Sequence, residues 1–311
     1  MTHGRKCDGR NTVNSIKLPE YDIRAERNVT VMTESIPELQ PYPIDADVEG
    51  LPYCLGPDGN IAMRDGSRMG YDSLKLRKGF VQYENGFSKD EKAVYSWGRR
   101  IMGANPATFR VLSRAFVTDG NHVWNHIGKV KDADPTTFAA CDSGEGNHWG
   151  TGYGKDANSV FFSPGDLRAR RVVKADTRTF RSCGDTCLVG YDDYFTFAQG
   201  SSIPKAKRKG WRYLSYSYSR DEKAIFYLNS RVEGADLESF EVVPVFSSHK
   251  IGPAPLARDR NHYYWCDEII DNDEFGAKFW IRYAVVSDPD DMPPIARKLG
   301  WELENPIVGR K

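Results

Sequence analysis

Six aspartates recur along the chain, and they are the first residues whose type and spacing could do chemistry. They are Asp90, Asp119, Asp156, Asp192, Asp221 and Asp259. Carboxylates can act in acid–base catalysis or bind calcium. A calcium loop of the EF-hand type needs oxygen ligands at alternate positions and a closing glutamate, which residues 90–93 do not offer. Because aspartate side chains in turns accept hydrogen bonds from the nearby backbone, we interpret all six as turn residues.

Cysteines are the second candidate group, since thiolates and imidazoles bind zinc. Cys183 and Cys187 are close in sequence, and Cys141 and His148 precede them. The positions that correspond to Cys141 and Cys183 in other copies of the repeat described below hold apolar residues, namely Leu112, Leu214 and Val243. We therefore interpret Cys141 and Cys183 as core positions filled by a small hydrophobic side chain, and we predict no metal site.

Motifs of known catalytic or cofactor sites are missing from the sequence. It contains no nucleophile elbow, phosphate loop, dinucleotide fingerprint or zinc-protease helix. The glycine-rich stretch 144–150 precedes neither a basic phosphate-binding signature nor a helical pattern, and the six histidines have no serine or cysteine partner at a recognisable spacing. The sequence therefore predicts no catalytic residue, no cofactor and no enzyme.

The aspartates mark a repeated unit. An apolar residue stands three positions before each one and an aromatic residue five positions after it. In chain order these are Phe87, Phe116, Tyr153, Val189, Tyr218 and Leu256, then Tyr95, Trp124, Phe161, Phe197, Phe226 and Tyr264. In the first five copies an alanine follows, with a large aromatic residue five positions later, as in Ala104 and Phe109. A register held over so many copies predicts a repeat architecture.

Each copy can be interpreted as a small β unit. Residues 119–122 have turn chemistry between two apolar runs and predict a hairpin, and a second turn at 125–128 leads to a third short strand. Asp134 before Pro135 predicts the start of a one-turn helix. Because so small a unit cannot bury its own apolar face, neighbouring copies must pack together.

The predicted fold is mainly β. It consists of tandem β-hairpin repeats with one-turn helices, stacked in a curved or solenoid-like array with irregular capping segments. We expect an irregular N-terminal cap at 1–86, six repeats at 87–275 and a C-terminal strand–helix cap at 276–311. Within that cap, the pattern predicts a strand at 279–286 and a short amphipathic helix at 293–303.

Residues 88–109, 117–138, 219–240 and 257–270 resemble the bacterial DKNYY repeat family, whose name describes the Asp-led turn and the aromatic residues after it. The fourth copy departs most, since Lys207 replaces the capping acid and Lys209 and Gly210 replace the threonine region. The resemblance implies a fold class and a bacterial context, but no activity common to the family and no residue-level function. It implies that members without an export signal are cognate inhibitors of secreted toxins.

Composition limits the class of protein. The chain has 311 residues, of which 40% are hydrophobic, with 43 basic and 43 acidic side chains. This is a globular composition, and a net charge of zero argues against a general electrostatic grip on nucleic acid. No segment is apolar enough for a signal-peptide core or a membrane span, so we expect a cytoplasmic protein. Six cysteines are too few for a disulfide scaffold.

Charges of opposite sign are segregated along the chain. Residues 164–214 hold eleven basic residues against five acidic ones, and residues 265–294 hold eight acids against Lys278 and Arg282. Such a charge distribution suits electrostatic steering of a protein partner. The alternative is that basic runs are solvated edges that prevent aggregation. For a toxin that handles nucleic acid or a nucleotide, the acidic stretch would mimic its substrate.

The sequence thus predicts a noncatalytic protein-binding repeat module and, with the resemblance, an immunity protein that binds and neutralises a cognate bacterial toxin. The insertions at 142–152 and 244–255 are the expected contact loops, with Trp149 as an aromatic anchor. The expected partner-binding residues are Glu145, His148, Trp149, Arg168, Arg170, Lys207, Arg208, Asp267, Glu268 and Asp271. A structural or surface-interaction repeat protein and an uncharacterised enzyme are the alternatives.

Overall fold

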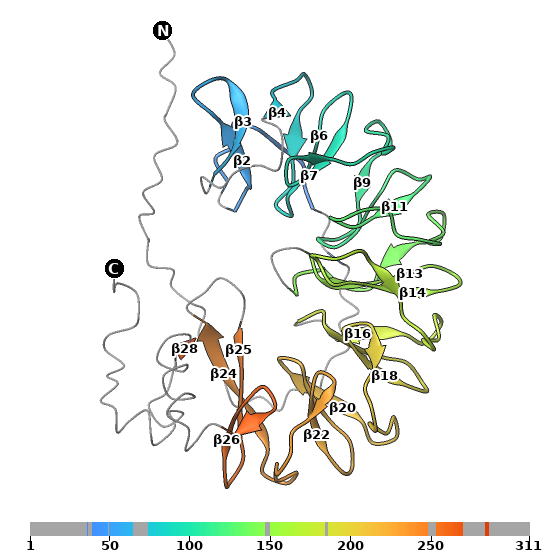
Figure 1. Cartoon of the computed structure of the whole chain (residues 1–311), viewed down its shortest axis with the longest axis vertical. Helices are drawn as coiled ribbons and strands as arrows, with labels where there is room; N and C mark the ends of the chain where they lie inside the picture. Colours follow the sequence, from blue (N-terminus) through green and yellow to red (C-terminus); the bar gives the residue numbers. More distant parts are fainter. Residues whose placement is uncertain are drawn as a thin grey trace.

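The computed structural model describes residues 36, 39–48, 50–64, 74–146, 150–183, 186–247, 253–269 and 284–285. In this part the chain forms short antiparallel strands arranged in seven sheets. Figure 1 shows the sheets following one another in chain order along a curved path, from the blue β2 and β3 to the orange β26. The mainly β prediction is confirmed. The predicted solenoid-like stacking of the repeats is not supported by this arrangement of separate sheets.

The first three sheets are built from residues 42–124. One has the order β2, β3, β4, with bounds Tyr53–Leu55, Asn60–Met63 and Leu74–Lys75. The next has the order β1, β5, β6, β7, β8, with bounds Tyr42–Pro43, Val81–Gln82, Phe87–Lys89, Val94–Ser96 and Arg99–Arg100. The third has the order β11, β10, β9, with bounds Val123–Trp124, Val117–Thr118 and Arg110–Val111. Residues before the first repeat therefore contribute regular strands.

Three four-stranded sheets follow, each with strands in chain order. They consist of β12 to β15 (Ala139–Ala140, Gly152–Lys155, Val160–Ser163, Arg170–Arg171), β16 to β19 (Arg181–Cys183, Val189–Tyr191, Thr196–Ala198, Ser201–Ser202) and β20 to β23 (Arg212–Ser215, Tyr218–Arg220, Ile225–Tyr227, Ser230–Arg231). The last sheet has the order β27, β26, β25, β24, β28 (Glu268–Ile269, Tyr263–Trp265, Pro253–Arg258, Glu241–Ser247, Ala284–Val285). Of the predicted C-terminal cap, only residues 284–285 are described, and the predicted helix at 293–303 lies outside the described residues.

The predicted one-turn helices are wrong. Residues 106–108, 135–137 and 177–179 form turns, and the part of the chain that the structure describes contains no helix. In the second copy, Oδ1 of Asp134 accepts a hydrogen bond of 2.9 Å from the N–H of Thr136, and Oδ2 accepts one of 2.8 Å from the hydroxyl of Thr137. The aspartate carboxylate thus accepts hydrogen bonds from the donors of this turn. The chain then enters β12 at Ala139 before a helical turn can form.

The turn interpretation of the repeated aspartates is confirmed, and from the second copy onward each carboxylate also reaches the preceding copy. Oδ1 of Asp156 accepts hydrogen bonds of 2.7 Å from the N–H groups of Asn158 and Ser159 in its own hairpin turn. Its Oδ2 accepts one of 2.8 Å from the N–H of Asp134, in the turn of the copy before. The same inter-copy bond joins Asp119 to Asn105, Asp192 to Asp176, Asp221 to Lys207 and Asp259 to Asp236. These aspartates therefore connect consecutive copies.

The apolar core lies between neighbouring sheets. Phe87, Val94 and Phe109 form one buried cluster with Val117 and Trp124 of the next sheet. Clusters of the same kind recur along the array. Neighbouring copies thus bury the apolar faces that one copy alone would leave in water.

Tyrosine hydroxyls add polar links between sheets. The hydroxyl of Tyr53 accepts a 2.9 Å hydrogen bond from the N–H of Gly98, in the β7–β8 turn of the next sheet. Tyr218 donates one of 2.7 Å to the carbonyl of Cys266, in the β26–β27 turn. In the first repeat a phenylalanine, Phe87, takes this position, and the ring of His126 from the next sheet stacks on it at 4.1 Å. Histidine therefore supplies polar groups where the tyrosine hydroxyl is missing.

Candidate functional site

The outer edge strands carry exposed side chains at a fixed place in the repeat. β8, β15, β19, β23 and β27 each lie at the end of their sheet and pair with one neighbour. Both residues of each strand are exposed. In chain order the pairs are Arg99–Arg100, Arg170–Arg171, Ser201–Ser202, Ser230–Arg231 and Glu268–Ile269, and in the second repeat Lys129 bridges to Trp124 at the corresponding place. The edge is therefore most basic in the first three repeats.

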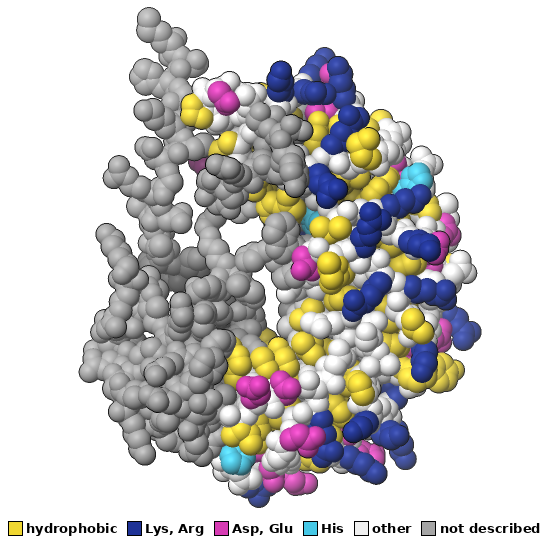
Figure 2. Space-filling view, in the orientation of Figure 1, with side chains coloured by type: hydrophobic (Ala, Val, Ile, Leu, Met, Phe, Trp, Pro, Cys, Tyr) yellow, Lys and Arg dark blue, Asp and Glu magenta, His cyan; other side chains and the backbone are white. Residues whose placement is uncertain are grey.

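Figure 2 shows Lys and Arg side chains gathered along the outer rim of the arc. Edge charges of this kind protect open strand edges from pairing with other chains, which explains their exposure without any ligand. A second feature of the rim is harder to explain in that way, because several of these cations converge on one cleft.

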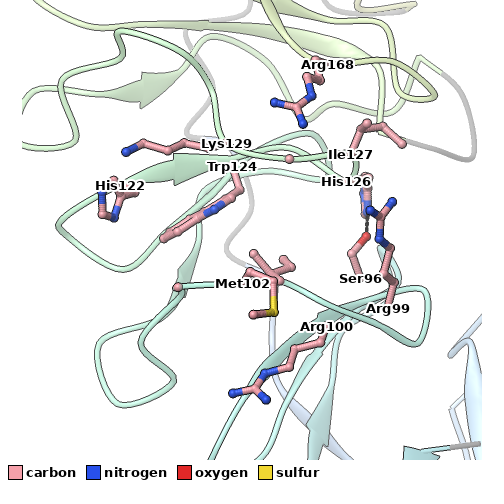
Figure 3. A pocket seen from close by; sticks show the side chains of 13 residues that line it. Ser96, Arg99, Arg100, Met102, His122, Trp124, His126, Ile127, Lys129 and Arg168 are labelled. Carbon is pink, nitrogen blue, oxygen red and sulfur yellow. Dashed lines mark hydrogen bonds between the residues drawn. The ribbon is translucent and has the colours of Figure 1, made fainter. Parts of the chain in front are cut away.

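The cleft lies where the β8 edge meets the β11 sheet, and its volume is about 440 Å³. Four basic residues line it: Arg99, Arg100, Lys129 and Arg168. In the view of Figure 3, Arg168 lies on one side and Arg99 and Arg100 on the other. The described residues that line the cleft include no Asp or Glu, and none of these four cations is among the ion pairs of the described part of the chain. The cleft thus concentrates positive charge.

Apolar side chains form the floor of the cleft. Ile101 and Ile127 contribute half-buried side chains, and Met102 is 76% exposed. Trp124 also contributes to the lining but is only 3% exposed, with the ring of His122 packed edge-on against it. Nδ1 of His126 lies 2.8 Å from the hydroxyl of Ser96. A dashed line in Figure 3 marks this hydrogen bond. This surface offers an apolar contact surrounded by cations.

Arg168 reaches the cleft from the third repeat because the loop that carries it is fixed to the second. The side-chain amide of Asn125 donates hydrogen bonds of 2.7 Å to the carbonyl of Leu167 and 3.1 Å to the hydroxyl of Ser163. The guanidinium group of Arg168 then lies beside Gly128. The β14–β15 loop of this copy, residues 164–169, therefore brings a cation from one sheet to the edge of another.

The predicted basic residues do not form one site. Arg168 lines the cleft, whereas the guanidinium group of Arg170 donates a hydrogen bond to the carbonyl of Gln199 and lies 5.7 Å from the Phe162 ring centroid. Lys207 is exposed, and its N–H donates to Asp221. Arg208 lies over the ring of Tyr191, 4.8 Å from its centroid. Their role in partner binding stays a prediction.

The other predicted partner-binding residues lie apart from the cleft. Glu145 forms an exposed ion pair of 3.1 Å with Arg114. Asp267 and Glu268 are in the last hairpin, at the start of β27. His148, Trp149 and Asp271 lie outside the described residues.

Sequence reasoning missed Arg99, Arg100 and Lys129. Basic residues were counted over a continuous window of the chain, whereas these cations come from different copies. Comparing copies at the positions nine and ten residues after the motif aspartate would have found them, because that comparison aligns Arg99 and Arg100 with Gly128 and Lys129. Structurally equivalent positions, not neighbouring ones, build this surface.

Two buried titratable groups have strongly shifted pKa values, and one of them, His126, is among the residues that line the cleft. Burial raises the pKa of Asp142 to about 7, although hydrogen bonds from Ser182 and from the N–H groups of Tyr153 and Gly144 oppose the rise. Burial lowers the pKa of His126 to about 4. Both groups bond to neighbouring elements, so their protonation bears on stability.

Cys183 lies in an apolar cluster with Val189 and Trp211, as its repeat position predicts. Burial raises the pKa of Cys141 and of Cys187 to about 12. Within the ranges that the structure describes, no group of three or more His, Cys, Asp or Glu side chains could hold a metal ion. The same ranges hold no helix with the length and apolar composition needed to cross a bilayer.

Comparison with known proteins agrees with the repeat analysis. No curated protein and no solved structure matches the chain. The model of the DKNYY family matches residues 87–230, which span the first four repeats and most of the hairpin of the fifth. The match confirms that these repeats resemble the DKNYY family.

Proposed function

We propose that this protein is a noncatalytic binding module for another protein, and that it acts in the cytoplasm as an immunity protein that neutralises a cognate bacterial toxin. The observation that carries the proposal is the convergence of Arg99, Arg100, Lys129 and Arg168, from three sheets, on one cleft. Cations that take part in none of the ion pairs of the described residues, placed around an apolar floor, suit the acidic face of a protein partner.

The charged edge supports protein binding more than a purely protective role. Protection of an open edge needs charge on each strand but no meeting of charges from different copies. Here the Asn125 side chain holds the loop that brings Arg168 over Gly128. Holding like charges close together costs free energy, which an acidic partner would recover.

The repeat array suits the role of a rigid support. Carboxylates such as Asp119 and Asp156 bond to both their own turn and the copy before, so the motif's polar groups hold the scaffold together. Recognition then falls to the exposed edges and loops. The toxin as the partner follows from what the family resemblance implies, and a basic edge would meet an acidic face of that toxin.

Co-expression tests the proposal directly. The toxin candidates are secreted proteins whose genes adjoin the gene of this chain, each expressed in a sensitive bacterial host with and without this chain. We expect restored growth and a complex that co-elutes in size-exclusion chromatography. Restored growth without a complex would contradict a binding mechanism, and a complex without protection would contradict the immunity role.

The salt dependence of the complex tests the electrostatic argument. Because exposed charges are screened within about 8 Å at physiological ionic strength, raising the salt concentration should slow association more than it speeds dissociation. An association rate that does not change with salt would exclude the basic edge as the steering surface.

A further inference from the structure

We propose that the cleft between β8 and β11 binds one acidic peptide segment of the partner, with an apolar side chain of that segment packed against Met102. This inference rests on the proposed function, which supplies the premise that the partner is a protein. It specifies where and through what chemistry that partner binds. The lining residues it uses are Arg99, Arg100, Met102, Lys129 and Arg168.

The cations determine the charge of the ligand. Guanidinium groups bind carboxylates through paired hydrogen bonds, and the cleft holds three of them beside one ammonium group. Aspartate and glutamate side chains on a single segment could occupy both sides of the cleft at once. The segment is therefore acidic.

Met102 determines the apolar part of the bound segment. A methionine that is 76% exposed leaves most of its thioether chain in water, and burying it against an apolar side chain is favourable. Ile101 and Ile127 extend the same floor. An acidic segment with an apolar residue between its carboxylates matches this arrangement of cations around an apolar centre.

Single-stranded nucleic acid fits the cleft less well. Binding of bases without sequence preference depends on aromatic faces open for stacking. Trp124 is the one Trp, Tyr or Phe residue among the described residues of the lining, and at 3% exposure it offers no such face. Phosphates could still meet the cations, so an oligonucleotide is the competing ligand in the test.

The cleft is held in place on both sides, which lowers the cost of binding. The N–H of Ile101 donates a 2.8 Å hydrogen bond to the carbonyl of Val94 on one side. On the other, Asn125 accepts one of 3.1 Å from the N–H of Gly128. Because these walls need not reorganise, little conformational entropy is lost in them when a segment binds.

Binding of a labelled peptide to the full chain tests the proposal. The probe is a fluorescein-labelled peptide in which one leucine is flanked on both sides by glutamates, followed by fluorescence anisotropy. We expect saturable binding that weakens at least about tenfold in Arg100→Glu and in Lys129→Glu, since each replaces an attraction by a repulsion. Replacing the leucine of the peptide by serine, or Met102 by serine, should weaken binding by a smaller factor.

Arg231→Glu is the matched control, because Arg231 stands at the same repeat position as Arg100 and Lys129 but outside the cleft. It should bind the peptide like the unchanged protein. Equal loss of binding in Arg231→Glu would reduce the effect to overall charge and overturn the site. Tighter binding of a labelled single-stranded oligonucleotide, with the same dependence on Arg100 and Lys129, would overturn the choice of ligand.

The two proposals can fail separately. If the toxin complex forms and protects but neither Arg100→Glu nor Lys129→Glu weakens it, the partner binds elsewhere and the inference is wrong. If the peptide binds as expected but the toxin is not neutralised, the cleft is a peptide site and the immunity function is wrong. Circular dichroism of the exposed-site variants establishes that their fold is unchanged.

Discussion

The N–H of Gly200 donates a hydrogen bond of 3.0 Å to the hydroxyl oxygen of Tyr153, 47 residues before it in the chain. The same hydroxyl donates one of 3.1 Å to the carbonyl of Leu188. Tyr153 lies on β13 and both of its partners flank strands of the next sheet. One side chain thus satisfies two backbone groups of its neighbour, which couples the two copies.

Removing this hydroxyl should weaken the link between the copies. In Tyr153→Phe the buried N–H of Gly200 loses its partner, so the free energy of unfolding should fall by about 1–3 kcal/mol. Tyr194→Phe is the control, because Tyr194 is 64% exposed and its loss should change stability by less than about 0.5 kcal/mol. Urea unfolding measures both variants, and equal effects would contradict the link.

Two adjacent aspartates separate the structural role of the motif carboxylate from general charge. Asp192 is fully buried and accepts hydrogen bonds from the N–H groups of Tyr194, Phe195 and Asp176, whereas Asp193 is exposed. Asp192→Asn places an amide donor against a backbone donor and should cost about 3 kcal/mol. Asp193→Asn should be nearly neutral in the same denaturation measurement. Similar losses in both would show that charge, not the inter-copy bond, matters.

His126 should make stability depend on pH. Burial lowers its pKa from 6.5 to about 4 in the folded protein, so the unfolded chain takes up a proton first as the pH falls. The stability contributed by the neutral ring is complete above pH 6.5 and is lost between 6.5 and 4, by about 1.4 kcal/mol per pH unit. The free energies of unfolding of the unchanged protein and of His126→Asn should therefore approach each other as the pH falls through this range, by about 1.4 kcal/mol per pH unit.

Asp142 has the opposite effect on the pH dependence of stability. The measurement must therefore compare the unchanged protein with His126→Asn. Its pKa is raised from 3.8 to about 7, so its contribution is complete below pH 3.8 and is lost as the pH rises through 7. In the unchanged protein the two groups partly cancel between pH 4 and 6.5. A difference between the protein and His126→Asn that stays constant over this range would contradict the pKa of His126.

Two glycines with positive φ distinguish backbone strain from steric overlap. Gly59 has a φ of 76° and open space where a β-carbon would lie, whereas Gly86 has a φ of 85° and its β-carbon would overlap the indole ring of Trp97. Gly59→Ala should therefore cost about 1 kcal/mol. Gly86→Ala should cost a further 1–3 kcal/mol or so, because the ring must move. Equal melting temperatures for the two variants would show that the indole ring of Trp97 can move aside without a loss of stability.

The repeat spacing was enough to predict the unit, and local chemistry explains why. Phe87, Phe116 and Phe161 are buried core residues, and the motif aspartates close the expected turns. The helix prediction was wrong because an aspartate such as Asp134 can either cap a helix or close a turn. Only the number of residues before the next strand, β12, distinguishes the two outcomes. The additional strands before residue 87 were missed because they are two to four residues long.

The cleft could not be predicted from the order of residues along the chain. Arg100, Lys129 and Arg168 come from three copies, and nothing local to Arg168 reveals that Asn125 turns its loop toward the second repeat. A window of sequence finds cations that are neighbours in the chain. It does not find cations that become neighbours because consecutive copies pack against each other.

The bond from each motif aspartate to the copy before gives the array a direction. Asp119 serves Asn105, and Asp259 serves Asp236, but Asp90 has no earlier copy to serve, and its Oδ2 accepts the hydroxyl of Tyr95 instead. Trimming the chain from its C-terminal end exposes a backbone donor in the last remaining copy at every step. Trimming from the N-terminal end instead leaves a carboxylate that keeps the bonds to its own turn. The two ends of a shortened array therefore differ chemically, with a backbone donor at one and a carboxylate acceptor at the other.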